Sequence, residues 1–474
     1  MSLIEGLNKI LQENLTRLHM PGHKGRKIFP EILKNNLQEI DITEIPGSDN
    51  LHHAQEILLE AQQRAAKVFG AQKTYFLING TTVGIQAMIL ATCRPGDKLL
   101  VPRNCHRSVF SALILGDIIP VYLSPISHPK TGIDLSISVE EIKKKLKQHP
   151  DVKGAVLTYP TYYGSCSDIE KIAKILHHKK KFLLVDEAHG AHLALHKNLP
   201  LSALQAGADI VVDSTHKILS SFTQSAMLHI GNQYLSTEKV ELFLGMLQSS
   251  SPSYLLMASL DWASQQAEEM GQIKWKKIIQ WTHQARKDIR HHTNMKPIGN
   301  EIIGHYHVVD YDPSKLLIDV SSTGLTGIET EKILREKYRI QVELSDYYHI
   351  LAMTGMGTIE QDIQRFTQAM IDIDHKYGNP HKKLTSFPIR IREGEMGLSP
   401  RKAIYAPSEK ILLKNAQGRM SKEFIIPYPP GIPMVLPGEV ITQEIIEEIE
   451  IMQRWGGTII GLEDNTLQNI QVIK

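Results

Sequence analysis

Seven short apolar runs alternate with amphipathic stretches between residues 70 and 230, and this alternation constrains the fold more than any other feature of the chain. The runs have the length of buried strands, and the stretches between them, such as 83–93, 139–148 and 169–178, have the length of helices. The apolar runs are residues 74–79, 98–103, 118–123, 154–160, 181–186, 208–214 and 225–230. Strands that alternate with helices favour an α/β fold with a mostly parallel sheet, here of seven strands, that helices cover on both faces.

The length of 474 residues exceeds what one hydrophobic core usually covers, so more than one domain is expected. We predict an N-terminal arm with loops over residues 1–60 and a large domain over 61–293. Residues 257–293 are expected to form a charged helical connector at its end. A smaller α+β domain over 294–474 is predicted to include a proline- and glycine-rich run (425–439) and a closing helix.

Charge and composition exclude several classes of protein. With a formal net charge of +2 and a pI near 8.2, the chain lacks the basic excess of a protein that binds nucleic acid or a membrane surface. The N-terminus does not resemble a signal peptide, and no apolar run reaches the roughly 18 residues of a membrane span. Cys93, Cys105 and Cys166 have no spacing typical of a disulfide framework or a zinc site. We expect a cytoplasmic protein that acts on a small molecule.

Polar residues follow the predicted strands at the points where the strands end. In open parallel sheets, ligands bind beyond the carboxyl ends of the strands. The polar groups at these ends are Asn79 to Thr82, Asn104 to His106, Thr161 to Tyr163, Asp186, and Ser214 to Lys217. The sequence therefore predicts a binding site at this edge of the sheet.

The stretch LLVDEAHGAH (183–192) contains the letters of a helicase box, but the helicase hypothesis fails. A nucleotide-hydrolysing box of that type needs an upstream GxxxxGK[ST] loop to hold phosphates, and no Gly-Lys pair occurs in the chain. A metal site built from Glu187, His189 and His192 is also disfavoured, because these residues follow a strand in a loop instead of sharing one helix face. We predict no metal.

Three elements on successive strands favour pyridoxal phosphate as a cofactor. NGTTVG (79–84) follows a strand and opens a helix, where backbone N–H groups suit a phosphate. Asp186 ends a buried strand and needs a cationic partner, which a protonated pyridine nitrogen would provide. Lys217, 31 residues later at the end of the next strand, can hold an aldehyde as a Schiff base. Each element alone is more often structural, but their ordered combination is what this cofactor requires of a protein.

The chain also resembles the ornithine/lysine/arginine decarboxylase family of fold type I pyridoxal-phosphate enzymes. The resemblance extends over nearly the whole chain and is least distinctive between residues 300 and 400. Its blocks are HMPGHKG (19–25), FLINGTTVG (76–84), PGDKLLVPRNCHRSV (95–109), PTYYG (160–164), LLVDEAHGAH (183–192), STHKILSSFTQSAML (214–228) and YPPGIPMVLPGE (428–439). After His52-His53 the family often has proline and glycine, whereas this chain has Ala54-Gln55. The chain resembles the short form of the family, which has no N-terminal receiver-like domain.

The resemblance implies roles for individual residues. Lys217 would be the Schiff-base lysine, Asp186 would pair with the pyridine nitrogen, and His106 would stack on the ring. Lys217 or His216 would return a proton to the substrate carbon, which gives Lys217, His106, His216 and Asp186 as the catalytic set. The cofactor-binding set is Gly80, Thr81, Thr82, His106, Asp186, Ala188, His189, Ser214, His216 and Lys217.

The same resemblance implies decarboxylation of a basic amino acid to an amine and carbon dioxide, as in polyamine biosynthesis. Arginine is favoured because short-form relatives include arginine decarboxylases, and lysine or ornithine are the alternatives. Candidates for binding the distal basic group are Glu44, Asp49, Glu343 and Glu439. Fold type I enzymes generally build the site from two subunits, so a homodimer or larger assembly is expected. The alternatives in function are an aminotransferase, an aldolase, or a non-catalytic pyridoxal-phosphate-binding protein.

Overall fold

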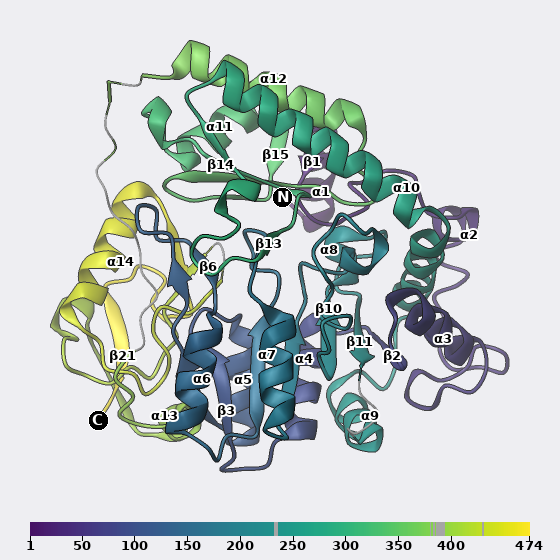
Figure 1. Ribbon diagram of the computed structural model, residues 1–474, viewed down its shortest axis with the longest axis vertical. Helices are drawn as coiled ribbons and strands as arrows, with labels where there is room; N and C mark the ends of the chain where they lie inside the picture. Colours follow the sequence, from purple (N-terminus) through teal and green to yellow (C-terminus); the bar gives the residue numbers. More distant parts are fainter. Residues whose placement is uncertain (232–235, 380, 383, 385–393, 429–430) are drawn as a thin grey trace.

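The computed structural model describes residues 1–231, 236–379, 381–382, 384, 394–428 and 431–474, and its centre is a seven-stranded sheet (Figure 1). All seven predicted strands are present in it. In spatial order they are β2 (Lys73–Leu77), β11 (Ala226–Ile230), β10 (Ile210–Asp213), β9 (Phe182–Asp186), β7 (Gly154–Thr158), β3 (Lys98–Pro102) and β4 (Ile119–Leu123). Only β11 runs antiparallel to its two neighbours in this sheet. The mostly parallel sheet is therefore confirmed.

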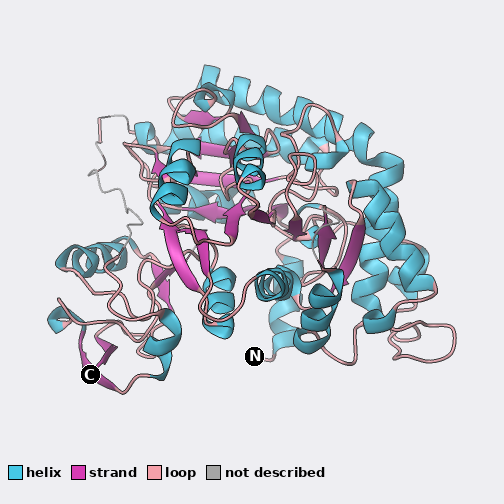
Figure 2. Ribbon diagram, turned by 60° about the horizontal axis from the view of Figure 1, so that its bottom comes forward, coloured by secondary structure: helices cyan, strands magenta, loops and turns pink. Residues whose placement is uncertain are grey.

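Helices cover both faces of the central sheet. Figure 2 shows the helices (cyan) packed around the strands (magenta). One face packs against α3 (Ile57–Phe69), α6 (Val139–Gln148), α7 (Ile169–His178) and α10 (Tyr254–His292). The other face packs against α4 (Gly80–Thr92), α5 (Arg107–Gly116) and α9 (Thr237–Leu247). Within β9, Leu183 and Val185 contact the first layer while Leu184 contacts the second. Because both faces are covered, the strands read as continuous apolar runs without polar alternation.

A second, antiparallel sheet forms the smaller α+β part of the molecule. Its strands in order are β12 (Lys296–Ile298), β14 (Lys315–Asp319), β17 (His349–Met353) and β16 (Leu344–Ser345). It shares a core with α11 (Gly327–Tyr338) and α12 (Glu360–Tyr377). The N-terminal arm joins this part, because β1 (Thr16–Leu18) pairs in parallel with β15 (Ile340–Val342). The N-terminal arm therefore pairs with a strand more than 300 residues later in the sequence.

The predicted helical connector is the helix α10, which is 39 residues long. It packs against α3 beside the central sheet and against α12 beside the smaller sheet (Figure 1). Its buried side chains include Trp275 and Ile278 in the core of the large domain and Ala285 and Ile289 in the core of the smaller part. One helix thus belongs to two cores.

A further cluster of buried apolar residues lies in the C-terminal segment, separate from the core of the smaller sheet. Its elements are α13 (Pro400–Tyr405), β18 (Ser408–Leu412), β19 (Ile426–Tyr428), α14 (Gln443–Trp455), β20 (Thr458–Ile460) and β21 (Asn469–Ile473). The closing helix that the sequence predicts is α14. Within the proline-rich run 425–439, residues 429 and 430 lie outside the described residues. The domain boundaries after residues 60 and 293 stay predictions.

Candidate active site

A cavity of about 860 Å³ lies where the carboxyl ends of the central strands face the smaller sheet. Its volume is that of a site for a small molecule or cofactor. The residues that line it from the predicted site set are Thr81, His106, Asp186, Ala188, His189 and Lys217. The smaller sheet and its flanking segments contribute Glu343 and Asp346, and the C-terminal segment contributes Tyr428 and Thr458. The prediction that these strand ends meet at one site is therefore reproduced by the structure.

Asp186 is a buried carboxylate at the end of β9 that has no cationic partner among the described residues. Its Oδ1 accepts a hydrogen bond from the backbone N–H of Ala188 at 3.1 Å. Burial raises the pKa of the Asp186 carboxyl, and the charge of Lys217 and the Ala188 hydrogen bond act in the opposite direction. A buried carboxylate in this state is stabilised by a cation that binds in the cavity.

Lys217 lies on the short helix α8 (Thr215–Ile218), and its amine points into the same cavity as Asp186. Its Nζ lies 3.0 Å from Nε2 of His189. Burial lowers the pKa of the Lys217 amine, against the opposing charges of Asp186 and Glu343. A lowered pKa increases the fraction of neutral amine, which is the nucleophilic form.

His106 occupies the N-cap position of α5, where its Nδ1 accepts a hydrogen bond from the Ser108 backbone N–H at 3.3 Å. The ring is accessible from the cavity. Desolvation by the surrounding protein, together with the positive charges of Lys217 and Arg107, lowers the pKa of His106 to about 4. The imidazole is therefore neutral at pH 7 and presents a flat, uncharged ring to a ligand.

The predicted phosphate-binding site is the N-terminus of α4, which begins at Gly80, shortly after the end of β2. Gly80 has a φ of 73°, a conformation that suits glycine. Thr81 lines the cavity, and its hydroxyl lies 2.9 Å from that of the buried Ser214. Gly80, Thr82, Ser214 and His216 do not line the cavity, although Gly80 and Thr82 flank Thr81 and His216 precedes Lys217. Together with Asp186, this helix N-terminus gives the site an end suited to an anion and an end suited to a cation.

The side chain of His216 is buried and does not line the cavity. Its Nδ1 lies 2.8 Å from the carbonyl oxygen of Ser225. Burial lowers the pKa of His216 to about 4, so the ring is neutral at pH 7. Its predicted role as a proton donor stays a prediction, because in this arrangement the ring contacts the backbone.

Of the four carboxylates considered for the distal group, only Glu343 lines the cavity. Its Oε2 accepts the Met20 backbone N–H at 2.8 Å, and its Oε1 accepts the Tyr162 hydroxyl proton at 2.8 Å. Asp49 accepts backbone N–H groups of its own loop, and Glu44 does not line the cavity. Glu439 forms a buried ion pair with Arg103 at 2.8 Å, which assigns it to the packing of the C-terminal segment.

Three residues suggested as metal ligands point to different partners. Glu187 accepts the Ala203 backbone N–H at 2.7 Å, His189 contacts Lys217, and His192 lies 3.1 Å from Asp312. Among the described residues, no group of three or more His, Cys, Asp or Glu side chains is arranged to hold a metal ion.

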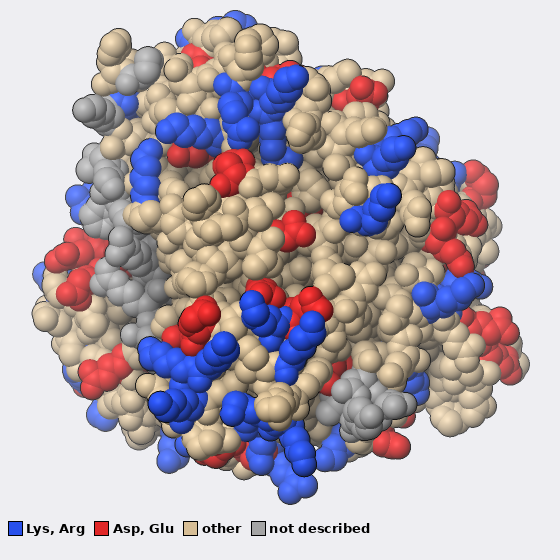
Figure 3. Space-filling model, viewed as in Figure 1, with Lys and Arg blue, Asp and Glu red and all other residues tan. Residues whose placement is uncertain are grey.

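In the same part of the chain, no helix combines the length and apolar character needed to cross a bilayer. Acidic and basic side chains are interspersed over the face in Figure 3.

Sequence reasoning missed two lysines beside the cavity. Lys24 is buried, and its Nζ donates to the His19 carbonyl at 2.6 Å. Burial and the neighbouring Lys315 lower the pKa of Lys24 to about 7, while Glu343 acts against this. Lys315 is fully buried at the first position of β14 and contacts His189. A charged residue at the start of the apolar run KLLIDV was a usable signal for Lys315, since a buried lysine needs a partner.

The chain is similar to proteins of known family. Residues 2–362 match the model of the Orn/Lys/Arg decarboxylase major domain, and residues 394–469 match that of the C-terminal domain. An arginine decarboxylase of Bacillus anthracis is 39% identical over 98% of this chain and 95% of its own. Lysine decarboxylase A from Pseudomonas aeruginosa superposes with a TM-score of 0.78 at 21% identity, over 92% of this chain and 74% of that one. L-threonine transaldolase from Pseudomonas fluorescens superposes with a TM-score of 0.61 at 16% identity, over 80% and 88% of the two chains.

Proposed function

Since the chain belongs to the Orn/Lys/Arg decarboxylase family of fold type I enzymes, we propose that it decarboxylates arginine with pyridoxal phosphate as its cofactor. The fold alone also serves aminotransferases and aldolases, so it is the family match that makes the chain a decarboxylase. The observation that carries the choice of arginine is the 39% identity to an arginine decarboxylase over 98% of this chain. The lysine decarboxylase LdcA of Pseudomonas aeruginosa is 24% identical over 94% of this chain.

The cavity residues fit the proposed cofactor. When bound, pyridoxal phosphate supplies a protonated ring that accepts the electron pair released as the carboxylate leaves. Asp186, buried without a protein cation, would keep the proton on the ring nitrogen. Thr81 and the N-terminus of α4 would bind the phosphate. Lys217 would hold the aldehyde carbon, and the neutral His106 ring would pack on the face of the heterocycle.

The charges around the cavity support a basic substrate. Besides Asp186, four carboxylates among the described residues line the cavity: Asp134, Glu331, Glu343 and Asp346. Besides Lys217, the lysine or arginine side chain that lines it in the described part of the chain is Arg335. An excess of carboxylates in an enclosed space attracts a guanidinium or ammonium group and repels a second carboxylate. Glu343 remains our candidate for contact with the substrate, because it is the one of the four carboxylates considered for the distal group that lines the cavity.

The proposal includes a homodimer, which the N-terminal helix α1 (Leu3–Gln12) supports. A capping box between Ser2 and Glu5 stabilises the start of this helix, so it forms despite few tertiary contacts. None of its residues is buried, and its exposed apolar side chains are Leu3, Ile4, Leu7, Ile10 and Leu11. An apolar stripe of this kind is stabilised by packing on another surface, here a second copy of the chain.

We place the enzyme in the cytoplasm and its amine product in polyamine biosynthesis.

The decisive experiment supplies the purified enzyme with arginine, lysine and ornithine separately and identifies each product amine together with carbon dioxide. We expect the arginine reaction to be fastest and to yield the amine that keeps the guanidinium. Lys217→Ala should remove both turnover and the visible absorbance of bound cofactor, whereas the exposed Lys332→Met should change neither. Keto-acid or aldehyde products, or full absorbance in Lys217→Ala, would contradict the proposal.

A further inference from the structure

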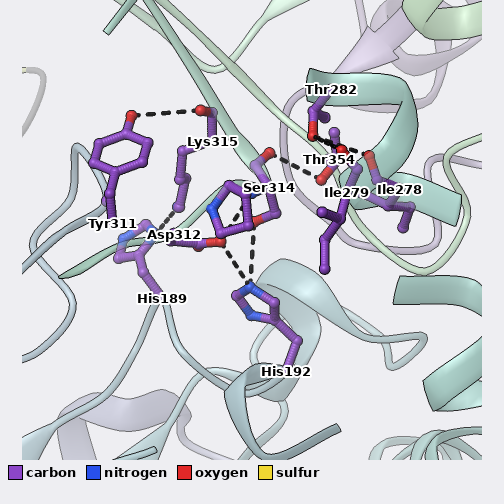
Figure 4. Close-up of polar contacts among 12 residues, drawn as sticks. His189, His192, Ile278, Ile279, Thr282, Tyr311, Asp312, Ser314, Lys315 and Thr354 are labelled. Atoms are coloured by element: carbon purple, nitrogen blue, oxygen red, sulfur yellow. Dashed lines mark hydrogen bonds and ion pairs between the residues drawn. The ribbon is translucent and has the colours of Figure 1, made fainter. Parts of the chain in front are cut away.

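His189 lies between two lysines, and each of its ring nitrogens contacts one of them. Nε2 lies 3.0 Å from Nζ of Lys217, and Nδ1 lies 2.9 Å from Nζ of Lys315. Figure 4 shows Lys315 reaching His189 from its own segment, on the side where Tyr311 and Asp312 lie. His189 is buried, and burial together with both lysines lowers the pKa of its imidazole far below the ordinary value. The ring is therefore neutral.

Counting protons restricts the charges of the two lysines. A neutral imidazole has one N–H and one lone pair, and an ammonium group can only donate. If Lys217 is charged and donates to Nε2, then Nδ1 carries the hydrogen and must donate to the lone pair of a neutral Lys315 amine. If Lys315 is charged, the tautomer is reversed and Lys217 is neutral. Both contacts can be hydrogen bonds only when at most one of the two lysines is charged, and with one charge the proton can reside on either lysine.

The surroundings of Lys315 make it a suitable holder of that charge. It is fully buried, and its amine contacts Nδ1 of His189 and, at 3.2 Å, the sulfur of Met353. No carboxylate lies within ion-pair distance of this amine among the residues that the structure describes. Burial lowers the pKa of Lys315 to about 8, where a change of charge near neutral pH costs little. The amine can thus exist in either state.

The other charged and titratable groups that face this triad act from several elements. The carboxylates of Asp186, Glu343 and Asp312 favour the positive charge on one lysine or the other. Lys24 disfavours a second positive charge in the same space, whereas the rings of His106 and His216 are neutral and add none. The balance again favours a single charge shared by Lys217 and Lys315.

The position of Lys315 is fixed by its own strand and by the turn before it. The Asp312 side chain contacts His192 at 3.1 Å and accepts the Ser314 backbone N–H at 2.9 Å, and Figure 4 shows these residues meeting beside His189. The Thr354 hydroxyl donates to the Ser314 carbonyl at 3.0 Å. Gly164 leaves room for the lysine stem, because a Cβ there would lie 3.0 Å from Lys315 Cγ. The amine is therefore held where it reaches Nδ1.

We propose that Lys315 is a positioning residue that takes up and returns the proton of Lys217 through His189. In the forward transfer, an N–H bond of Lys217 breaks and Nε2–H forms, while Nδ1–H breaks and an N–H bond of Lys315 forms. The imidazole changes tautomer, no charge is created, and Lys217 becomes a neutral amine. The inference rests on the proposed role of Lys217 and extends it by naming where the proton goes.

The test measures how fast the full-length chain, freed of cofactor, captures pyridoxal phosphate as a function of pH, followed by visible absorbance. Capture requires neutral Lys217, so the midpoint of the profile reports its protonation. In Lys315→Met the proton can reside only on Lys217, and we expect a midpoint about one pH unit higher and capture about tenfold slower at pH 7. At high pH, where Lys217 is neutral in all variants, rates should agree within about twofold.

Lys315→Arg provides the opposite perturbation. A guanidinium always donates to Nδ1, so Nε2–H faces Lys217 and favours its neutral form. The midpoint should therefore move down in Lys315→Arg and up in Lys315→Met, whereas a merely structural role would shift both in the same direction. In a His189→Phe background, Lys315→Met should have less than about a twofold effect, because the path is already broken.

Lys332→Met on the exposed face of α11 is the matched control and should leave the profile unchanged. Superimposable profiles of the wild type and Lys315→Met, or shifts of equal sign in Lys315→Met and Lys315→Arg, would overturn the inference while leaving the proposed function intact. If Lys315→Met fails to fold, His189→Phe alone should raise the midpoint of the capture profile and slow capture at pH 7, because it also removes the path between the two lysines. Capture at a lysine other than Lys217, located by borohydride reduction and peptide mapping, would instead overturn the proposed function and the premise of the relay.

Discussion

Removing the carboxylate of Glu439 should loosen the attachment of the C-terminal segment to the large domain. Arg103 follows β3 and is fully buried, and its Nη2 donates to Glu439 Oε2 at 2.8 Å. The guanidinium also donates to the carbonyls of Pro433 at 2.6 Å and Met434 at 2.9 Å. Glu439→Met would leave this cation buried without an anion, which is more costly than never having had the pair.

The magnitude follows from the geometry. At 2.8 Å and an effective dielectric constant of about 20, the attraction between the two charges is about 6 kcal/mol before desolvation is counted. Breaking a buried pair by removing one partner costs about 3–5 kcal/mol, and the two remaining carbonyl bonds favour the lower value. A loss of about 3 kcal/mol makes local opening of the C-terminal segment about 150-fold more frequent.

The assay is native-state proteolysis, in which mass spectrometry follows release of fragments from residues 394–474. We expect cleavage in Glu439→Met to be about 150-fold faster than in the wild type. The double variant Arg103→Met/Glu439→Met removes both charges and should lie within about tenfold of the wild type. Glu409→Gln, which breaks the exposed pair with Arg419 in the same segment, should change the rate by less than about fivefold. A Glu439→Met rate equal to that of Glu409→Gln would refute the reasoning.

Four further outcomes are expected. Asp186→Asn should still bind pyridoxal phosphate but lose activity by about a thousandfold or more, since the ring proton loses its counter-charge, and near-normal rates would argue against that role. Gly164→Ala, at a φ of 100° and with a Cβ 3.0 Å from Lys315 Cγ, should be less stable by about 1–3 kcal/mol in urea unfolding. The folded pKa of His216 lies at about 4, below the unfolded value near 6.5, so the unfolded chain binds its proton first as pH falls. Stability should therefore drop by about 1.4 kcal/mol per pH unit between pH 6.5 and 4 on account of this residue, and His216→Asn should flatten the urea-midpoint profile accordingly. Leu7→Ser with Leu11→Ser should weaken the proposed dimer at least about tenfold in light scattering, and an unchanged mass at low concentration would contradict the role of α1.

The sequence was sufficient for the content of the central sheet but not for its full arrangement. Each strand is a continuous apolar run between turn residues, so all seven were predicted within a few residues. The direction of β11 was not predictable, because the 12 residues between Asp213 and Ala226 allow either a crossover or a return. The pairing of β2 with β11 joins residues about 150 positions apart, and no local pattern records that contact.

The candidate site divides in the same way. Asp186, His106 and Lys217 were identifiable because strand ends on one sheet meet at one edge. Lys315 was missed because it belongs to a different sheet and reaches the site from the start of a strand. Glu439 was considered as a candidate for the substrate, because the sequence does not show that Arg103 lies opposite it. Such contacts depend on how whole layers pack.

The length of α10 has a consequence for how a substrate can enter. Its 39 residues span about 58 Å, contain no proline, and pack against both the large domain and the smaller sheet. A hinge motion that separated the large domain from the smaller sheet would have to bend α10 or remove one of its ends from the core in which it is buried. Access to the cavity should therefore depend on side chains and loops at the rim, and the two walls that carry His189 and Lys315 should keep their separation throughout a catalytic cycle.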